Sequence, residues 1–531
     1  MAAPLPVSAR RGYGLGSVAT GSFGTVPGLL LLPYLTDRLG VPAGVAGLVV
    51  FLPKAWDVLL NPVAGRVSDR STHPGGRRRP FLLRAGLALA VAFVLLFSGP
   101  TSPTGLAATW VVVLFLACAT AYAFFQVPYV AMPAEMTDDY DERTRLMTWR
   151  VAVLALAILV SGGLSPVVRD ALGPTWGYRG VGLFVAVLIA IGTVGAWWGT
   201  RTAPMSRAAT AGGSLRDQLR VVAAARDFRT LLAVFVLQAL ATGAMLAGVD
   251  YVARVLLGSP GASTVLFVCF VGPALLVTPL WQRVGERRGK RTGYVWGSVL
   301  LGAGALATLA ATAVGTAATA AAVGVVGVGY AACQMFPLAM LPDVAAADTA
   351  RTGEDRAGTY TGVWTAGETL GLAVGPFLYA GVLALGGYVS STDSAAVQPD
   401  SAHVAIALGF TVVPAVLVAG SLLVLRRYHL DEGMSHRCPP PVPPVRTPAT
   451  CSPSSAPCAP TTCRPTAGAP WPTSTTPGLP RPIPSAVRPS RCSRRRTAWT
   501  PPRFPHCCGW RTTSSPTPAR CSTPRRASPA R

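Results

Sequence analysis

Long apolar stretches recur along this chain and constrain its fold more than any other feature. Each has about 20 residues, the length that a helix needs to cross a bilayer. They predict twelve transmembrane helices, near residues 14–36, 42–65, 81–99, 105–133, 148–168, 178–200, 229–257, 261–283, 293–313, 316–341, 358–386 and 402–425. Only 13% of the 531 residues are charged, about half the share of a soluble protein. The sequence therefore predicts an all-α, multi-pass protein of the cell membrane and argues against a soluble, secreted or disordered chain.

The net charge of +24 resembles that of a nucleic-acid-binding protein, but the charges are distributed as in a membrane protein. Fifteen arginines and no acids lie in residues 433–531, and the remaining excess occupies alternate loops between the apolar stretches. By the positive-inside rule, both termini are cytoplasmic. We therefore expect a lipid bilayer and a small-molecule solute as partners, no nucleic acid, and a monomer.

Internal repeats indicate two related halves. Residues 69–80, after the second predicted helix, are echoed by residues 285–291 after the eighth. Residues 128–138, after the fourth, are echoed by residues 337–348 after the tenth. A duplicated half is typical of secondary transporters. The predicted domains are a six-helix bundle at 1–201, a central cytoplasmic loop at 202–228, a second six-helix bundle at 229–433 and a tail at 434–531.

The tail differs in composition from the rest of the chain. It holds 24 of the 48 prolines and eight of the eleven cysteines. Such a segment cannot bury a core, so we expect it to be disordered. The same composition results when a GC-rich gene is read out of frame, so the tail is either genuine or frame-shifted. Its cysteine spacings match no zinc pattern, so we expect no metal and no cofactor.

Ionisable residues inside predicted helices need a reason, because a charge in hydrocarbon is costly. The five examples are Lys54, Asp57, Arg150, Asp250 and Glu368. Asp57 and Asn61 are one helical turn apart, so they face the same direction. A carboxylate and an amide oxygen there can hold Na⁺ or a transferable proton. The alternative for Asp57 is a structural ion pair with Lys54.

For two of these residues, Asp250 and Glu368, we expect other surroundings. Asp250 is near a helix end, so we expect a solvated residue at the membrane interface. Glu368 lies among small residues, which allow another helix to come close. It is expected either to pair with Arg150 or Lys54, or to contact the solute.

Charges at the cytoplasmic helix ends have two interpretations. Most of these arginines fit simple anchoring by the positive-inside rule. Asp69 is an acid among arginines, and it can close the cytoplasmic side through charge pairs and helix dipoles. The residues assigned to gating are Asp69, Arg70, Arg77, Arg78, Asp138, Arg145, Asp348 and Arg356.

Several motifs are similar to those of one transporter family. They are Trp56-Asp57…Asn61-Pro62…Ser68-Asp69-Arg70…Gly76-Arg77-Arg78-Arg79-Pro80, then Val127-Pro128-Tyr129…Pro133…Glu135, and finally Pro342-Asp343…Ala347-Asp348. Across residues 12–432 the chain resembles the glycoside–pentoside–hexuronide:cation symporters, to which melibiose permease belongs, within the major facilitator superfamily. The resemblance implies the major facilitator fold, with alternating access coupled to H⁺ or Na⁺.

The resemblance also implies roles for particular residues. Asp57 corresponds to a cation-site acid of the family, and Arg150 to an arginine near the sugar. Asn61 and Gln126 stand where the family has acids, so the expected cation-coupling residues are Asp57, Asn61 and Gln126. The expected substrate-binding residues are Arg150, Glu368, Trp149, Trp364 and Tyr122, although the aromatic ones also suit packing.

Departures from the family pattern leave the solute open. Gly21 and Val130 stand where the family has an acid that holds sugar hydroxyls and a tryptophan that stacks on the sugar. A sugar or glycoside symporter is the first interpretation, and a transporter of a lysolipid or another lipid-derived amphiphile is the second. A third alternative is a non-transporting receptor or scaffold, but such a protein has no reason to hold Asp57 and Arg150 in lipid. No catalytic residues are predicted, so the chain is not expected to be an enzyme.

Overall fold

The computed structural model describes residues 5–71, 73, 78–137, 139–201, 203, 225–259, 261–352, 357–392 and 397–428. The predicted tail at 434–531 and most of the predicted loop at 202–228 lie outside these residues. Within the described ranges the chain forms helices and short connections, with no strand. The all-helical prediction is therefore confirmed.

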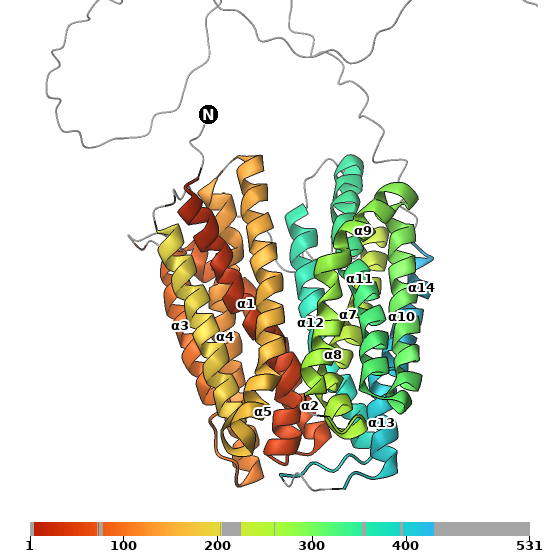
Figure 1. The fold of residues 1–531 in the computed structure, drawn as a ribbon. Helices are drawn as coiled ribbons and strands as arrows, with labels where there is room; N and C mark the ends of the chain where they lie inside the picture. The colour runs from red at the N-terminus through yellow and green to blue at the C-terminus, as the bar shows by residue number, and fades with distance from the viewer. Residues whose placement is uncertain are drawn as a thin grey trace, which may run out of the picture. The chain divides into compact units, whose positions relative to one another are not determined.

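The helices fall into two groups along the chain (Figure 1). The first half contains α1 (Val7–Pro33) with the π-helical turn η1 (Tyr34–Arg38), α2 (Ala43–Asp69), α3 (Arg79–Leu96), α4 (Thr104–Met136) and α5 (Tyr140–Thr200). The second half contains α7 (Arg226–Tyr251) with the π-helical turn η2 (Val252–Leu256), α8 (Ala262–Val271), α9 (Pro273–Arg288), α10 (Lys290–Val314), α11 (Thr316–Thr352), α12 (Ala357–Leu385), α13 (Asp400–Phe410) and α14 (Val412–Leu425). Among the described residues, eleven helical segments are long and apolar enough to cross a membrane.

Helix α5 joins two of the predicted spans. Its helical conformation is interrupted at Gly173, which has φ 72° and ψ −175° and is followed by Pro174. Glycine adopts a positive φ without the strain that a Cβ would cause. The apolar segment around this break has 56 residues, although about 20 residues suffice for one crossing. The predicted helices at 148–168 and 178–200 are therefore connected through Gly173.

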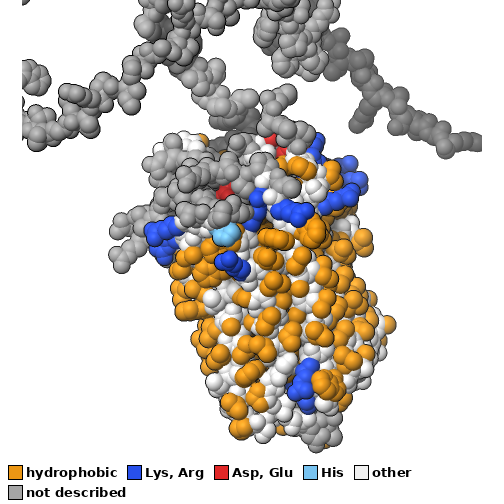
Figure 2. Space-filling view, turned by 90° about the vertical axis from the view of Figure 1, so that its left-hand side faces the viewer, with side chains coloured by type: hydrophobic (Ala, Val, Ile, Leu, Met, Phe, Trp, Pro, Cys, Tyr) orange, Lys and Arg blue, Asp and Glu red, His pale blue; other side chains and the backbone are white. Residues whose placement is uncertain are grey.

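Apolar side chains cover the surface that a bilayer would surround. Figure 2 shows hydrophobic side chains over most of one face of the helices, while Lys and Arg gather toward one end. Large side chains such as Val91, Leu183 and Trp198 are exposed on this surface. In water such exposure would be unfavourable, whereas in hydrocarbon it is not. The arrangement agrees with a multi-pass membrane protein.

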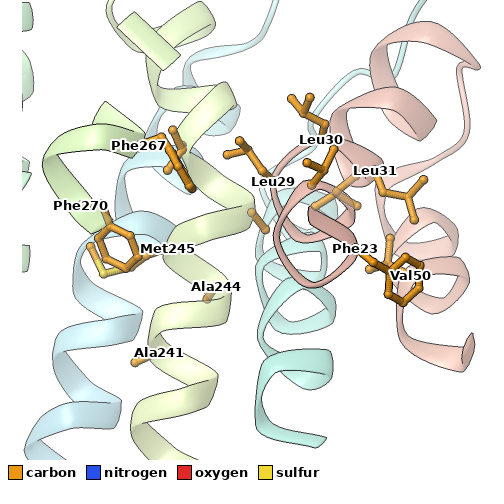
Figure 3. Packing of buried hydrophobic residues seen from close by; sticks show 14 of the residues in the cluster. Phe23, Leu29, Leu30, Leu31, Val50, Ala241, Ala244, Met245, Phe267 and Phe270 are labelled. Atoms are coloured by element: carbon orange, nitrogen blue, oxygen red, sulfur yellow. The ribbon is translucent and has the colours of Figure 1, made fainter. Parts of the chain in front are cut away.

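Small residues let helices approach closely, as is typical in membranes. A Cβ added at Gly192 would lie 2.7 Å from the backbone nitrogen of Ala19, so α5 lies directly against α1. Between the two halves, a Cβ at Gly47 of α2 would lie 2.7 Å from the Cβ of Ala380 in α12. Figure 3 shows Leu29 of α1 beside α7, near Phe267 of the second half. The two halves thus share a close-packed apolar contact.

Candidate functional site

Asp57 is an acid buried between helices without a complete set of hydrogen bonds. It lies on α2 between Pro53 and Pro62, and 6% of its surface is exposed. Its Oδ1 accepts no hydrogen bond from any described residue. Asn61 follows one turn later and is half-buried. A buried carboxylate oxygen without a donor is free to bind a proton or a cation.

Gln126 is on α4, which packs against α2. It is half-buried, and its Oε1 also lacks a hydrogen-bond partner among the described residues. The structure therefore places the three expected cation residues on two neighbouring helices. Unsatisfied oxygen atoms on both helices are the type of group that coordinates Na⁺ or relays a proton.

Lys54 and Asp57 do not form the direct ion pair that was the alternative interpretation of Asp57. Within the described ranges, no ion pair joins Lys54 to an acid. Instead, its ammonium lies over the ring of Phe23, with Nζ 5.3 Å from the ring centroid. An aromatic face attracts a cation, and the Asp57 carboxylate also acts electrostatically on Lys54 without a direct ion pair. Lys54 therefore lies close to the cation site but has no ion-pair partner among the described residues.

Arg150 is held over an aromatic ring in the same way. Its guanidinium carbon lies 5.7 Å from the ring centroid of Tyr129, and its Nε has no hydrogen-bond partner among the described residues. The ring is fixed because the Tyr129 hydroxyl donates to the carbonyl of Tyr13 at 2.7 Å and lies 3.0 Å from Ser17 Oγ. Helices α1 and α4 thus position the arginine of α5.

Charged residues from both halves act electrostatically on Tyr122. It is half-buried on α4, with its ring 4.6 Å from that of Phe23. Asp57 and Arg150 of the first half and Glu368 of the second all act electrostatically on its hydroxyl. Glu368 lies on α12, is half-buried, and forms no ion pair with another described residue. These residues define the central site, which consists of Lys54, Asp57, Tyr122, Gln126, Arg150 and Glu368.

The two expected tryptophans differ in their surroundings. Trp364 is 1% exposed and stacks on Phe235 with ring centroids 4.4 Å apart. It packs inside the second half and presents almost no surface to a solute. Trp149 is 47% exposed and lies beside Gly14 of α1. Of the two, only Trp149 has surface available for a ligand.

Four described members of the expected gating set, Asp69, Arg78, Arg145 and Asp348, pair with neighbours in their own half. Arg78 binds Asp69 at 2.9 Å and Glu135 at 2.6 Å, which ties α2, α3 and α4 together. A similar contact in the second half joins Lys290 to Asp343 at 2.6 Å. Arg145 binds Glu142, and Asp348 binds Arg351. The side chain of Arg70 is exposed. Arg77, Asp138 and Arg356 lie outside the described residues. A role for these charges in closing the two halves stays a prediction.

A buried ion-pair network at the opposite helix ends was not foreseen. Arg169 of α5 and Asp250 of α7 are 4% and 1% exposed, and two hydrogen bonds of 2.8 Å join them. Ser263 donates to Asp250 at 2.7 Å, and Arg254 lies 3.2 Å from the same carboxylate. The expectation of a solvated Asp250 is wrong, because two arginines and a hydroxyl compensate its charge inside the protein.

A second group of polar contacts joins the halves at the same end. Tyr388 donates to Asp37 at 2.9 Å, and Thr36 lies 2.8 Å from the hydroxyl of Tyr251. Burial and the Asp37 carboxylate raise the pKa of Tyr388, which keeps its hydroxyl protonated as a donor. Two ion pairs join the halves at this end, Arg169 to Asp250 and Arg254 to Asp170. The structure is thus closed at this end of the helices.

The sequence did contain a signal for this network. Arg169-Asp170 and Asp250…Arg254 carry equal numbers of opposite charges at helix ends that otherwise have few charges. Complementary charges of this kind indicate mutual pairing, because an isolated charge near the membrane would be costly.

Comparisons with known proteins identify relatives over most of the chain. The family described as MFS/sugar transport protein matches residues 12–432. The inner membrane symporter YicJ of Escherichia coli (strain K12) is 26% identical over 438 residues, covering 80% of this chain and 92% of the relative. The putative glycoside/cation symporter YagG of the same strain is 26% identical over 428 residues, covering 79% and 91%. The structure of the nucleoside transporter NupG has a TM-score of 0.59 at 14% identity, covering 79% of this chain and 99% of NupG.

We predict that removing one member of the buried pair is more damaging than removing both. Asp250→Asn leaves the buried Arg169 with only the more exposed Asp170, 3.0 Å away, as counter-charge, so we expect a loss of about 3–5 kcal/mol in the free energy of unfolding. Thermal unfolding in detergent measures the effect. The double variant Arg169→Met, Asp250→Leu should recover part of the loss, since it leaves no unpaired charge. Arg254→Gln, at a more exposed position, is the control and should cost less. A double variant no more stable than Asp250→Asn would contradict this prediction.

Proposed function

Because the chain belongs to the MFS/sugar transport protein family, it is a membrane transporter, and we propose that it carries a small organic solute together with a cation by alternating access. The proposed topology has twelve crossings, in which α5 accounts for two, and cytoplasmic termini. The observation that carries the coupling proposal is Asp57, a buried carboxyl whose Oδ1 has no hydrogen-bond partner among the described residues. A purely structural acid would be expected to have a partner.

Alternating access gives the buried pair a role. The positive-inside rule places the arginine-rich helix ends in the cytoplasm, so the Arg169–Asp250 pair lies toward the outside. In our proposal, the described state is closed to the outside, and the pair separates when the transporter opens outward. The pair is then a gate that stabilises one of the two states.

The coupling ion is proposed to be H⁺ rather than Na⁺. Among the three expected cation-coupling residues, Asp57 is the only one with a carboxylate, and Asn61 and Gln126 contribute neutral amide groups. A Na⁺ ion would need these amides and backbone carbonyls as a cage, whereas a proton needs only the carboxylate. Flux in vesicles with an imposed pH gradient or an imposed Na⁺ gradient distinguishes the two ions.

We predict that Asp57→Asn abolishes uphill accumulation and spares solute exchange. The amide can neither take up a proton nor carry the charge that attracts Na⁺, but solute exchange needs no net cation movement. Accumulation and counterflow in vesicles are measured in parallel. Glu286→Gln, an acid-to-amide change at the exposed end of α9, is the control and should retain both activities. Normal accumulation by Asp57→Asn would show that this acid does not couple transport.

The solute is proposed to carry an acidic group. Lys54 and Arg150 each lie over an aromatic ring without an ion-pair partner among the described residues, and both belong to the central site. A sugar or glycoside with a carboxylate or a sulfonate would pair directly with these two side chains. Its acidic group would gain charge-assisted hydrogen bonds that a neutral sugar cannot form.

The position of Gly21 supports a departure from the family's sugar-binding mode. A Cβ at Gly21 would lie 3.0 Å from the Cβ of Ala157 and 3.2 Å from the carbonyl of Leu154. The residue is therefore packed against α5, where a longer acidic side chain has no room. Val130, the other departure, is exposed and offers an apolar surface. This surface keeps a lysolipid with an acidic head group as the second candidate.

We predict that Lys54→Gln and Arg150→Gln each weaken binding of an acidic sugar about tenfold or more, since each removes a charge-assisted contact. Thermal shifts of purified protein are compared for glucuronate, glucose and an acidic lysolipid. Arg66→Gln, an exposed change on α2, is the control and should bind as the wild type does. Equal stabilisation by glucose and glucuronate would exclude the acidic-solute proposal, and stabilisation by the lysolipid alone would favour the second candidate.

A further inference from the structure

A pocket lies between the beginning of α7 and the end of α14. It has a volume of about 360 Å³ and is lined by Arg226, Arg229, Thr230, Ala233, Val424 and Arg427. Since α7 rises about 1.5 Å per residue, Arg226 is roughly 36 Å along the helix from Asp250. The pocket is therefore at the arginine-rich end of the protein, and the proposed transport mechanism makes no use of it.

Three arginines give this pocket a concentrated positive charge. Arg226 and Arg229 come from the first turns of α7, and Arg427 follows the last turn of α14. All three are exposed, and no ion pair or hydrogen bond joins any of their guanidinium groups to another described residue. Asp227 is in the same turn of α7 but is not among the lining residues. These arginines thus differ from Arg78 and Arg169, which are both paired.

The helix geometry adds to the attraction for an anion. The N-terminal turn of α7 has backbone N–H groups that no residue within the helix can satisfy. The helix dipole is positive at this end, which favours negative charge. A phosphate placed among the three arginines would meet both favourable contributions.

Apart from Thr230, the rest of the pocket lining is apolar. Ala233 lies one turn below Arg229 on α7, and Val424 lies one turn below Arg427 on α14. Leu423, which precedes Val424 on α14, is exposed. The positive end thus adjoins an apolar wall, the same order in which a phospholipid presents its phosphate and its acyl chains. A free phosphate would make no use of this apolar wall.

We propose that this pocket binds an anionic phospholipid, with the phosphate between Arg226, Arg229 and Arg427 and the acyl chains along Ala233 and Val424. Basic pockets between transmembrane helices on the cytoplasmic side are suited to anionic head groups. Such a lipid would bridge the first and last helices of the second half, which pack against each other. The proposal does not depend on the identity of the transported solute.

The test compares lipid binding by the full chain and by two triple variants. Purified protein is mixed with phosphatidylglycerol, phosphatidylcholine or inorganic phosphate, and bound lipid is counted by native mass spectrometry while thermal shifts are recorded. We expect phosphatidylglycerol to bind and stabilise the wild type more than phosphatidylcholine does. Arg226→Gln, Arg229→Gln, Arg427→Gln should weaken that binding about tenfold or more, because each basic residue contributes to attraction for anionic lipid.

A matched control removes the same charge elsewhere. Arg283, Arg287 and Arg291 are exposed arginines around α9 and the start of α10, and changing all three to Gln should leave binding of phosphatidylglycerol unchanged. If the pocket triple variant does not insert into the membrane, Arg427→Gln alone provides the same comparison. Equal losses in the pocket and control variants would overturn the proposal, because they indicate general surface charge. Equal stabilisation by inorganic phosphate, or equal binding of the two lipids, would also overturn it.

Discussion

Arg169 and Asp250 form the contact on which the relation between the two halves depends. Each is almost fully buried, and neither charge could remain there alone, because desolvation of a single ion costs more than the fold can easily compensate. The pair therefore requires α5 and α7 to be adjacent at this end. When the halves separate, water or another charge must replace the lost partner of each ion. Because a partly separated pair has neither, a change between two states is more favourable than a gradual one.

The same constraint distinguishes structural charges from functional ones. Arg78, Lys290 and Arg169 all have acids within 3 Å, and they fix helices in place. Lys54 and Arg150 instead lie over the faces of aromatic rings and have no ion pair with described residues. A protein that only needed stability would have apolar residues at these positions. In our proposal, the acidic group of the solute pairs with both of these side chains.

The sequence predicts elements whose cause is local and fails where the cause is a distant contact. Apolar length alone was sufficient to locate the helices, because nearly every helix must span the same hydrocarbon thickness. The continuous helix through Gly173 was missed, because the charged and Gly-Pro residues at 169–174 are also typical of a loop between two helices. The buried state of Asp250 was missed because its partner Arg169 is 81 residues away in sequence. Asp57 was identified from its own helix, but the absence of a direct ion pair between Lys54 and Asp57 required the positions of neighbouring side chains.

Charge balance in the central site gives a physical reason for coupling solute and cation movement. When ionised, Lys54 and Arg150 contribute two positive charges, and Asp57 and Glu368 contribute two negative charges. The empty site is then neutral, which a low-dielectric environment favours. An acidic solute that enters alone would leave one excess negative charge, whereas a solute accompanied by one monovalent cation restores neutrality. Because both occupied and empty sites are neutral in this scheme, either can cross between the two states, and partially loaded states are disfavoured.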